Sequence, residues 1–476
     1  MPSTSTFRIS LRGLDKLIPK IRESISKHKL ASILVVGIIV RVILMPISAH
    51  PFDMDVWYAA ALSVVKNGPL SIQSFPPVEG YILIIPIAYF YNWIVHTFSI
   101  GFLGPISMSS LPKALNFYPT FNLLYVPGFL FDTLVKLPLL FSDVFVTIVL
   151  YRVVIGLTNN RGLAEKAAIF WFLNPFLIWI SAVWGMWDTL PALFSLLCLY
   201  FLLKKRFVYS AVCLSIGVFL KVYPALFLVP IAIFLYKTSS AECKLKNSLK
   251  FFSVFSIATL LLFVPYFSKI ISVFSGILAP NPVTSGAVTN PVSNPVGFGL
   301  TYWSLYLLNR LINLPVTSAF VSSVSIASII LVIAALGLVY WKTTKLTFAK
   351  PVYDLGLALL LPVFALFLSF RIINEQWFVW ALPFLVILSV GGRVKGVFYW
   401  GASAVSLLYV VLNCPLPFFF LPLAPWFTNA LLSLANFILT YDSTRIVLLV
   451  ASGCVFSVLS VLMLFQIAKT CRSENP

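Results

Sequence analysis

The chain has 476 residues, of which 60% are hydrophobic and 10% are charged. A soluble protein of ordinary composition has about 25% charged residues, so a soluble globular fold and a disordered chain are both excluded. Apolar runs of roughly 20 residues, the length that crosses a bilayer, recur from residue 31 to residue 468. We therefore predict an all-α polytopic membrane protein.

The net charge of +19 does not indicate a nucleic-acid partner, because of how the charge is distributed. The basic residues form short clusters between apolar runs, which is typical of cytosolic loops. Residues 1–30 are predicted to be a cytosolic basic segment, and residues 31–476 a single transmembrane domain. The six cysteines are scattered and show neither a metal-binding spacing nor a disulfide framework.

The basic clusters place the N-terminus in the cytosol and separate twelve predicted spans. These spans are residues 31–48, 137–155, 167–184, 187–203, 207–221, 223–236, 251–267, 318–341, 352–370, 377–391, 396–412 and 446–468.

Between residues 49 and 136 the number of crossings must be even. Either residues 80–98 lie flat in the outer interface, or they cross and residues 115–132 cross back, which gives about 12 to 14 spans in all. The long external segments are residues 49–79, 268–317 and 413–445, and the last of these is expected to include an interfacial helix. Because internal connections are mostly short, chemistry or recognition is expected on the external face.

Charged and polar side chains gather at the external ends of the spans. Asp53 and Asp55 follow the first span, and Asp188 lies in a short turn between two spans. A carboxylate kept beside hydrocarbon is costly and is a functional candidate. The other candidates are Trp57, Tyr58, Glu79, Trp184, Trp187, Lys221, Tyr223, Arg371, Asn374, Glu375 and Gln376.

Structural roles are also open for such residues. An aspartate just past a span can cap a helix, and a lysine or arginine can extend toward the interface. Asp132, Lys136 and Asp143 share one helix face, where a structural pairing of Lys136 with one of the two aspartates is expected.

Together these residue types suit the transfer of a sugar from a lipid phosphate to a hydroxyl. A carboxylate at the membrane surface can act as general base, cations can hold a phosphate at headgroup depth, and aromatic rings can flank a sugar. One direct displacement would invert the anomeric carbon. We expect Asp53, Asp55, Asp188, Lys221 and Glu375 to converge in one external cavity.

Three motifs resemble the GT-C superfamily of multispan glycosyltransferases, closest to prokaryotic and GPI-type mannosyltransferase-like members. An acidic pair, Asp53-Met54-Asp55, opens the first external loop and is followed by Pro76-Pro77. The segment Trp184-Gly185-Met186-Trp187-Asp188-Thr189-Leu190-Pro191 is similar to the Trp-Gly-x-x-Asp-x-x-Pro signature. Phe219-Leu220-Lys221-Val222-Tyr223-Pro224 resembles the Phe-Lys-x-Tyr-Pro turn, and Asn374-Glu375-Gln376 resembles a late His-Glu turn with asparagine in place of histidine.

The resemblance implies an aspartate base in the first external loop, with Asp55 as first choice and Asp53 as the alternative. The remaining candidates are then substrate-binding residues. It implies a polyprenyl- or dolichyl-phosphate-sugar donor, with mannose as the expected hexose, and a lipid-linked glycan or glycolipid acceptor among membrane lipids. No cofactor is required, although a divalent cation at Asp53 and Asp55 stays open. The expected location is a prokaryotic cell membrane, with the active site extracytoplasmic.

Two other classes of protein compete with this interpretation. A lipid or glycan transporter or flippase would also bury charges, but the sequence shows no inverted repeat and no matched pair of broken helices. A polysaccharide ligase or polymerase usually depends on external arginines and a histidine, and only His50 and His96 are available here.

Overall fold

The computed structural model describes residues 28–69, 81–99, 104–117, 123–264, 318–370 and 373–473. Glu79 and Arg371 lie outside these residues, as do the predicted external loop 268–317 and nearly all of the basic N-terminal segment. The roles proposed for them remain predictions from sequence.

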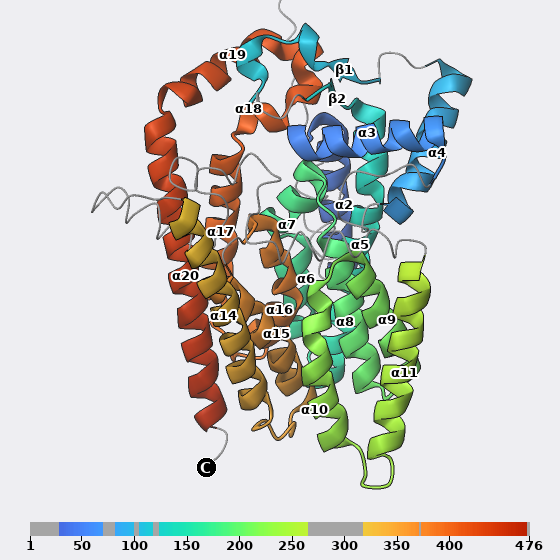
Figure 1. The fold of residues 1–476 in the computed structure, drawn as a ribbon, viewed down its shortest axis with the longest axis vertical. Coiled ribbons are helices and arrows are strands. Elements are labelled where there is room, and N and C mark those ends of the chain that lie inside the picture. The colour runs from blue at the N-terminus through green and yellow to red at the C-terminus, as the bar shows by residue number, and fades with distance from the viewer. Residues whose placement is uncertain are drawn as a thin grey trace, which may run out of the picture.

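The described chain forms an elongated bundle of helices, with its C-terminal end at the lower end in Figure 1. The elements are α2 (Lys29–Ile47), α3 (Pro51–Asn67), α4 (Tyr81–Phe98), β1 (Ile106–Ser107), η4 (Met108–Ser110), η5 (Lys113–Leu115), β2 (Tyr125–Val126), α5 (Phe129–Thr158), α6 (Arg161–Phe172), α7 (Pro175–Ile178), η7 (Trp179–Trp184), α8 (Thr189–Leu203), α9 (Phe207–Leu220), η8 (Tyr223–Phe227), α10 (Leu228–Thr238), α11 (Lys244–Phe263), α14 (Ser318–Thr343), α15 (Pro351–Ser369), η11 (Glu375–Trp380), α16 (Leu382–Val390), α17 (Gly396–Asn413), α18 (Leu416–Phe419), η12 (Leu421–Leu423), α19 (Ala424–Thr440) and α20 (Asp442–Ser473).

The prediction of an all-α polytopic membrane protein is confirmed. Within the described residues, eight helices are long and apolar enough to cross a membrane, and α6 with α7 and η7 forms a ninth, bent by 43°. The predicted spans coincide with these or with shorter apolar helices such as α8, α9 and η8 with α10. The only strands in the described residues are β1 and β2, an antiparallel pair of two residues each.

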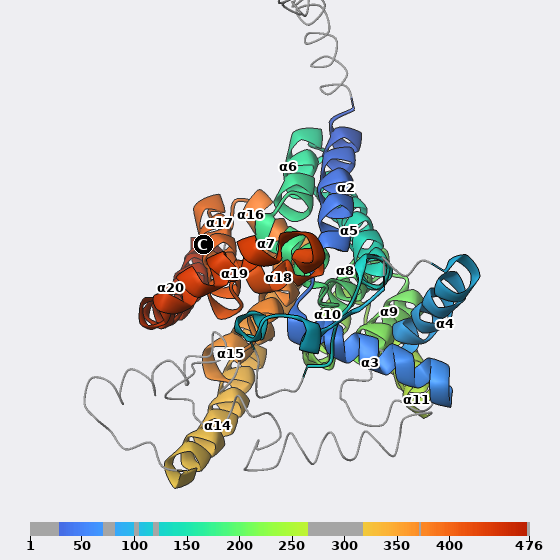
Figure 2. The same ribbon diagram turned by 90° about the horizontal axis from the view of Figure 1, so that it is seen from above.

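The ambiguous stretch after the first span stays at the upper end of the bundle. α3 lies across this end, and α4 and the β1–β2 pair are beside it (Figure 1). Seen from above, α3 and α4 cover one side of the bundle and α19 covers another (Figure 2). This placement agrees with the alternative in which residues 80–98 lie in the outer interface, and the topology of the stretch stays a prediction. α5 begins at Phe129, two turns before the predicted start, because its polar first turns are packed inside the protein.

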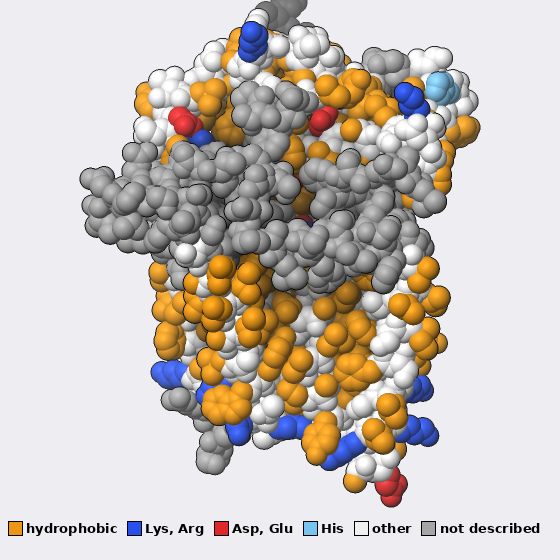
Figure 3. Space-filling view, viewed as in Figure 1, with side chains coloured by type: hydrophobic (Ala, Val, Ile, Leu, Met, Phe, Trp, Pro, Cys, Tyr) orange, Lys and Arg blue, Asp and Glu red, His pale blue; other side chains and the backbone are white. Residues whose placement is uncertain are grey.

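The surface separates into an apolar band and a basic end. Hydrophobic side chains cover much of the middle and lower part of the face in Figure 3, and Lys and Arg side chains gather near its lower end. The connections α8–α9 and α10–α11 lie there and carry exposed lysines, including Lys204, Lys205 and Lys237. The positive-inside rule predicts that this end faces the cytosol.

Candidate functional site

The first helix of the upper layer presents Asp53. Pro51 occupies the first turn of α3 and His50 is its N-cap, positions that proline and a capping side chain favour. The Trp184 indole N–H donates to Asp53 Oδ2 at 2.7 Å, and His50 Nδ1 lies 2.8 Å from the same oxygen. The Asp53 side chain is 24% exposed. Among the described residues, its other oxygen, Oδ1, has no hydrogen-bond partner.

His50 is a site residue that the sequence interpretation of the sugar-transfer chemistry did not include. It is buried, stacks on Trp184 with ring centroids 4.6 Å apart, and meets the Phe419 ring edge-on. Burial disfavours its charged form, but the Asp53 carboxylate and the Cys414 side chain together outweigh burial and raise the pKa of His50 to about 10. The contact with Asp53 Oδ2 at 2.8 Å is therefore an ion pair, and it is shorter than the 3.3 Å between His50 Nδ1 and the Asp53 backbone nitrogen.

Asp188 and Lys221 form a second ion pair at the upper end. Lys221 Nζ lies 2.8 Å from Asp188 Oδ1, and the Trp380 indole N–H donates to the same oxygen at 2.5 Å. The Asp188 side chain is fully buried whereas that of Lys221 is 15% exposed. Lys221 also lies 5.4 Å from the centroid of the Trp380 ring. Asp188 Oδ2 is buried without a partner in the described residues.

The two ion pairs are electrostatic neighbours. Burial would raise the pKa of Asp53, but His50, the Trp184 hydrogen bond and the charge of Lys221 together lower it. Glu375 is also linked to this group: burial raises its pKa, a hydrogen bond from Asn413 at 2.8 Å opposes that effect, and both His50 and Asp53 influence it. Asp53, Asp188, Lys221 and Glu375 are therefore linked by electrostatic interactions, whereas their convergence in one substrate cavity stays a prediction.

Asp55 does not share these partners. Its carboxylate is buried and accepts the Tyr125 backbone N–H at 2.8 Å, so it fastens α3 to β2. Burial raises the pKa of Asp55, opposed by this and a neighbouring backbone N–H. Residues two apart on a helix point about 200° apart, and the predicted acidic pair is accordingly divided between two surroundings.

Each of the predicted sugar-binding aromatic rings packs against another aromatic ring. Tyr223 stacks on Trp380 at 4.1 Å, and Trp57 stacks on Trp187 at 4.7 Å. Tyr58 contacts a separate cluster of Tyr91, Tyr125 and Phe131, so it is not brought to the acidic group. These stacks cover one face of each ring and leave less ring surface for a sugar than the sequence suggested.

The residues of the late turn, 374–376, differ in how far they are buried. Asn374 is half-buried at the start of η11, and Gln376 is buried with its side-chain oxygen unpartnered among the described residues. Trp377, one of the aromatic residues expected to flank a sugar, stacks on Trp380 at 4.6 Å. Trp380 was missed, and its place in the same aromatic turn as Glu375 was the available signal.

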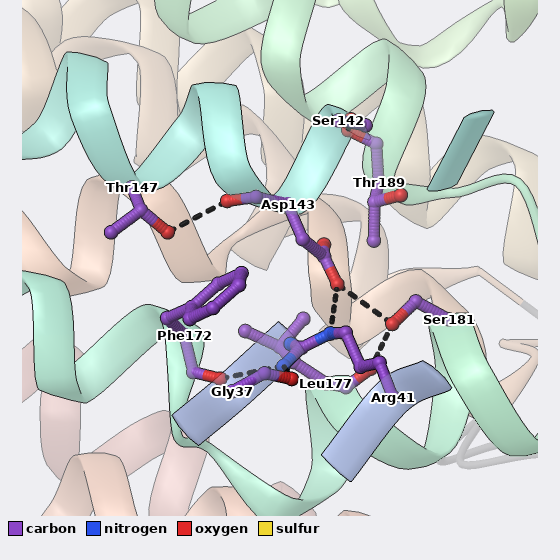
Figure 4. A network of polar contacts seen from close by, with 9 residues as sticks. All are labelled: Gly37, Arg41, Ser142, Asp143, Thr147, Phe172, Leu177, Ser181 and Thr189. Carbon is purple, nitrogen blue, oxygen red and sulfur yellow. Dashed lines mark hydrogen bonds and ion pairs between the residues drawn. The ribbon is translucent and has the colours of Figure 1, made fainter. Parts of the chain in front are cut away.

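Of the two aspartates expected to pair with Lys136, Asp132 interacts with it electrostatically, without a direct hydrogen bond. Lys136 Nζ donates to the carbonyls of Met45, Ser48 and Val183, with the Met45 distance at 3.0 Å. Asp143 instead pairs with Arg41 at 2.9 Å (Figure 4). A lysine at the ends of two helices satisfies carbonyls that the helices leave free, so its role is still structural.

No metal site is formed by the residues that the structure describes. They contain no group of three or more His, Cys, Asp or Glu side chains placed to hold a metal ion. Asp53 and Asp55, the residues considered for a divalent cation, bind different partners.

Comparisons with known proteins match the middle of the chain. Residues 180–276 match the family described as Mannosyltransferase (PIG-M). An 81-residue stretch is 31% identical to GPI mannosyltransferase 1 of Saccharomyces cerevisiae (strain ATCC 204508 / S288c), covering 16% of this chain and 20% of that protein. The chain thus matches one fifth of the relative's length. The matches confirm the predicted resemblance to GPI-type mannosyltransferases, in a segment that holds Trp184, Asp188 and Lys221.

Proposed function

We propose that this chain is a multi-pass membrane mannosyltransferase. It moves a mannose from a polyprenyl- or dolichyl-phosphate donor to a hydroxyl of a lipid-linked glycan or glycolipid. One observation carries the proposal: the segment that matches a mannosyltransferase family supplies Trp184, Asp188 and Lys221. Trp184 donates to Asp53, and Lys221, which is paired with Asp188, influences Asp53 by its charge.

Asp53, rather than Asp55, is proposed as the base. Its Oδ2 is held by Trp184 and His50, while Oδ1 has no partner among the described residues and the side chain is partly exposed. The lowered pKa keeps the carboxylate ionised at neutral pH. In the proposed step the acceptor oxygen attacks the anomeric carbon, its proton passes to Asp53 Oδ1, and the lipid phosphate leaves with inversion. Asp55 is less suited to this role because it is buried and holds β2.

Lys221 is proposed to contact the leaving phosphate. Asp188 Oδ1 holds the ammonium at 2.8 Å, and the Lys221 side chain is 15% exposed, so it reaches the surface of the protein. Asp188 and the ring of Trp380 fix the direction of the side chain. A cation near the departing phosphate stabilises its developing charge. Arg371, Glu79, Asn374 and Gln376 stay proposed as further substrate-binding residues.

The site is proposed to face the extracytoplasmic side. The basic connections lie at the opposite end of the bundle, which supports a cytosolic N-terminus. The proposed location is the cell membrane of a prokaryote.

A reconstituted assay tests the proposed function. The purified protein in liposomes is given dolichyl- or polyprenyl-phosphate mannose labelled in the sugar, together with a glycolipid extract as acceptor. We expect label to move to a larger lipid product with wild type and not with Asp53→Asn. Movement of intact donor across the bilayer without a new glycosidic bond would contradict the proposal and favour a flippase.

A further inference from the structure

The helix that leads to the site is broken inside the bundle, and its break is repaired by an arginine from α2. In an unbroken helix the Phe172 carbonyl would accept the backbone N–H of Phe176. That N–H instead donates to the Asn174 side chain at 3.0 Å. Arg41 Nη1 donates to the Phe172 carbonyl at 2.8 Å and replaces the lost bond. The guanidinium also lies 4.4 Å from the centroid of the Phe172 ring.

The same arginine is joined to the far side of the break through Asp143. Arg41 Nε donates to Asp143 Oδ2 at 2.9 Å, and the Ser181 hydroxyl donates to the same oxygen at 2.7 Å (Figure 4). The Leu177 carbonyl is a second acceptor for this hydroxyl, at 2.9 Å. The hydroxyl has one proton, and the shorter bond to an ionised carboxylate is the stronger. We call Arg41, Asp143 and Ser181 the buried clamp.

The buried clamp lies one helical turn from a residue that touches the proposed base. Ser181 and Trp184 both belong to η7, a π-helix, and Trp184 donates its indole N–H to Asp53 Oδ2. The Trp184 carbonyl also accepts the His50 backbone N–H, at 3.4 Å. A π-helical turn is often found at a functional site, and here its two ends meet the clamp and the base.

Stability alone is a weak reason to keep this ion pair. Both side chains are fully buried, and removing two charges from water costs about as much as their attraction returns, so apolar residues of similar volume often stabilise equally well. Apolar residues could not donate a hydrogen bond to the Phe172 carbonyl or accept one from Ser181.

We propose that the buried clamp is a positioning device that sets the register of η7 and thereby places the Trp184 indole on Asp53. Arg41, Asp143 and Ser181 act through Trp184 and do not touch substrate. The catalytic part of this inference rests on the proposed function, whereas the link from clamp to Trp184 does not.

Ser181→Ala is the variant that tests the clamp without breaking the ion pair. Ser460→Ala is its matched control, because Ser460 is also fully buried and donates to a carbonyl of its own helix, at 2.9 Å. The first readout is the Trp184 indole N–H signal in protein labelled with 15N-tryptophan, identified by its loss in Trp184→Phe. We expect this signal to move in Ser181→Ala and to stay in Ser460→Ala. An unmoved signal in Ser181→Ala would overturn the proposal.

The second readout is mannosyl transfer per folded molecule. We expect Ser181→Ala to lower kcat about tenfold, the size of one hydrogen bond to a charged group, with KM for the donor unchanged. In a Trp184→Phe background the same change should have almost no further effect, because interacting residues are not additive. Independent, multiplying effects would overturn the proposed route through Trp184. If wild type shows no transfer while the indole signal still moves, the clamp stands and the proposed function fails.

Discussion

Arg41 with Asp143 and Lys221 with Asp188 are ion pairs of similar design in different places. In both, one carboxylate oxygen receives two donors and the other oxygen is buried without a partner among the described residues. The deep pair is fully buried on both sides, whereas the Lys221 side chain is 15% exposed. At Asp53, too, one carboxylate oxygen receives two donors, and the side chain is 24% exposed.

The comparison indicates that the exposure of the side chains decides whether a carboxylate with two donors on one oxygen serves structure or chemistry. Two donors on one oxygen fix the direction of a carboxylate. Where water and substrate are excluded, the fixed group can only hold helices together. Where the second oxygen reaches the surface, as at Asp53, the same fixation aims a free lone pair outward.

The largest expected effect is at Asp53. Asp53→Asn keeps an oxygen that can accept the Trp184 N–H but removes the proton acceptor, so transfer should fall about 10²–10⁴-fold. Asp55→Asn is the control, since its amide oxygen can still accept the Tyr125 N–H, and its turnover should stay near wild type. Initial rates on equal amounts of folded protein decide the matter. The opposite pattern would make Asp55 the base.

Replacing the cation of each pair with methionine measures how much each ion pair contributes to the free energy of unfolding. Arg41→Met leaves Asp143 charged in a closed interior and should lower the free energy of unfolding by about 3–5 kcal/mol. Lys221→Met leaves Asp188 next to a partly open surface, so its cost should be clearly smaller. Thermal unfolding in one detergent measures both. Equal losses would show that partial exposure of the cation does not separate the two pairs.

A smaller effect is expected at the turn between η7 and α8. Gly185 has φ +89°, and an added Cβ would lie 3.0 Å from Lys136 Cε and 3.2 Å from Met54 Sδ. Gly185→Ala should cost about 1–2 kcal/mol for the left-handed backbone and should also lower transfer, since the turn carries Trp184. Gly156→Ala, where a Cβ meets nothing within 4 Å, should be neutral or slightly stabilising. Similar melting shifts for both variants would refute this account.

The smallest effect is expected at Glu375, and it depends on pH. Its folded pKa is raised, chiefly by burial, so ionisation disfavours the folded state and stability falls as pH rises from the ordinary glutamate pKa of about 4.3 through the raised one. Glu375→Gln, which can still accept from Asn413, should therefore raise the melting temperature at pH 7 and leave it unchanged near pH 4. A gain that is the same at both pH values would argue against a charge effect.

Hydropathy was sufficient to predict the spans, because each apolar run must find a helix in lipid. It also pointed to Asp188 and Lys221, because each is a charged residue in a short connection between two predicted spans. Asp53 and Asp55 were predicted as a pair in an external loop, and only the helix α3 with its tertiary contacts to Trp184 and Tyr125 distinguishes their surroundings.

Partners that are distant in the sequence could not be predicted. Trp380 donates to Asp188 from 192 residues away, and a tryptophan in an aromatic turn gives no sign of which carboxylate it meets. Arg41 lies in the first predicted span, and its partner Asp143 was one of two aspartates considered for Lys136, because helix spacing reports only neighbours on one helix. The carbonyls that Lys136 binds belong to two other segments.

The first external helix is tied to a segment made near the end of synthesis. The Ala49 backbone N–H donates to the Phe419 carbonyl at 2.7 Å, and the Phe419 ring packs against His50. At about 5–20 residues per second, Phe419 is added roughly 20–70 s after Ala49. During that interval the nascent protein has its Asp53 helix on the membrane surface without the contact that fixes His50. The site is therefore completed late, and a chain that stops before residue 413 would insert most of its spans and still lack the Phe419 contacts of Ala49 and His50.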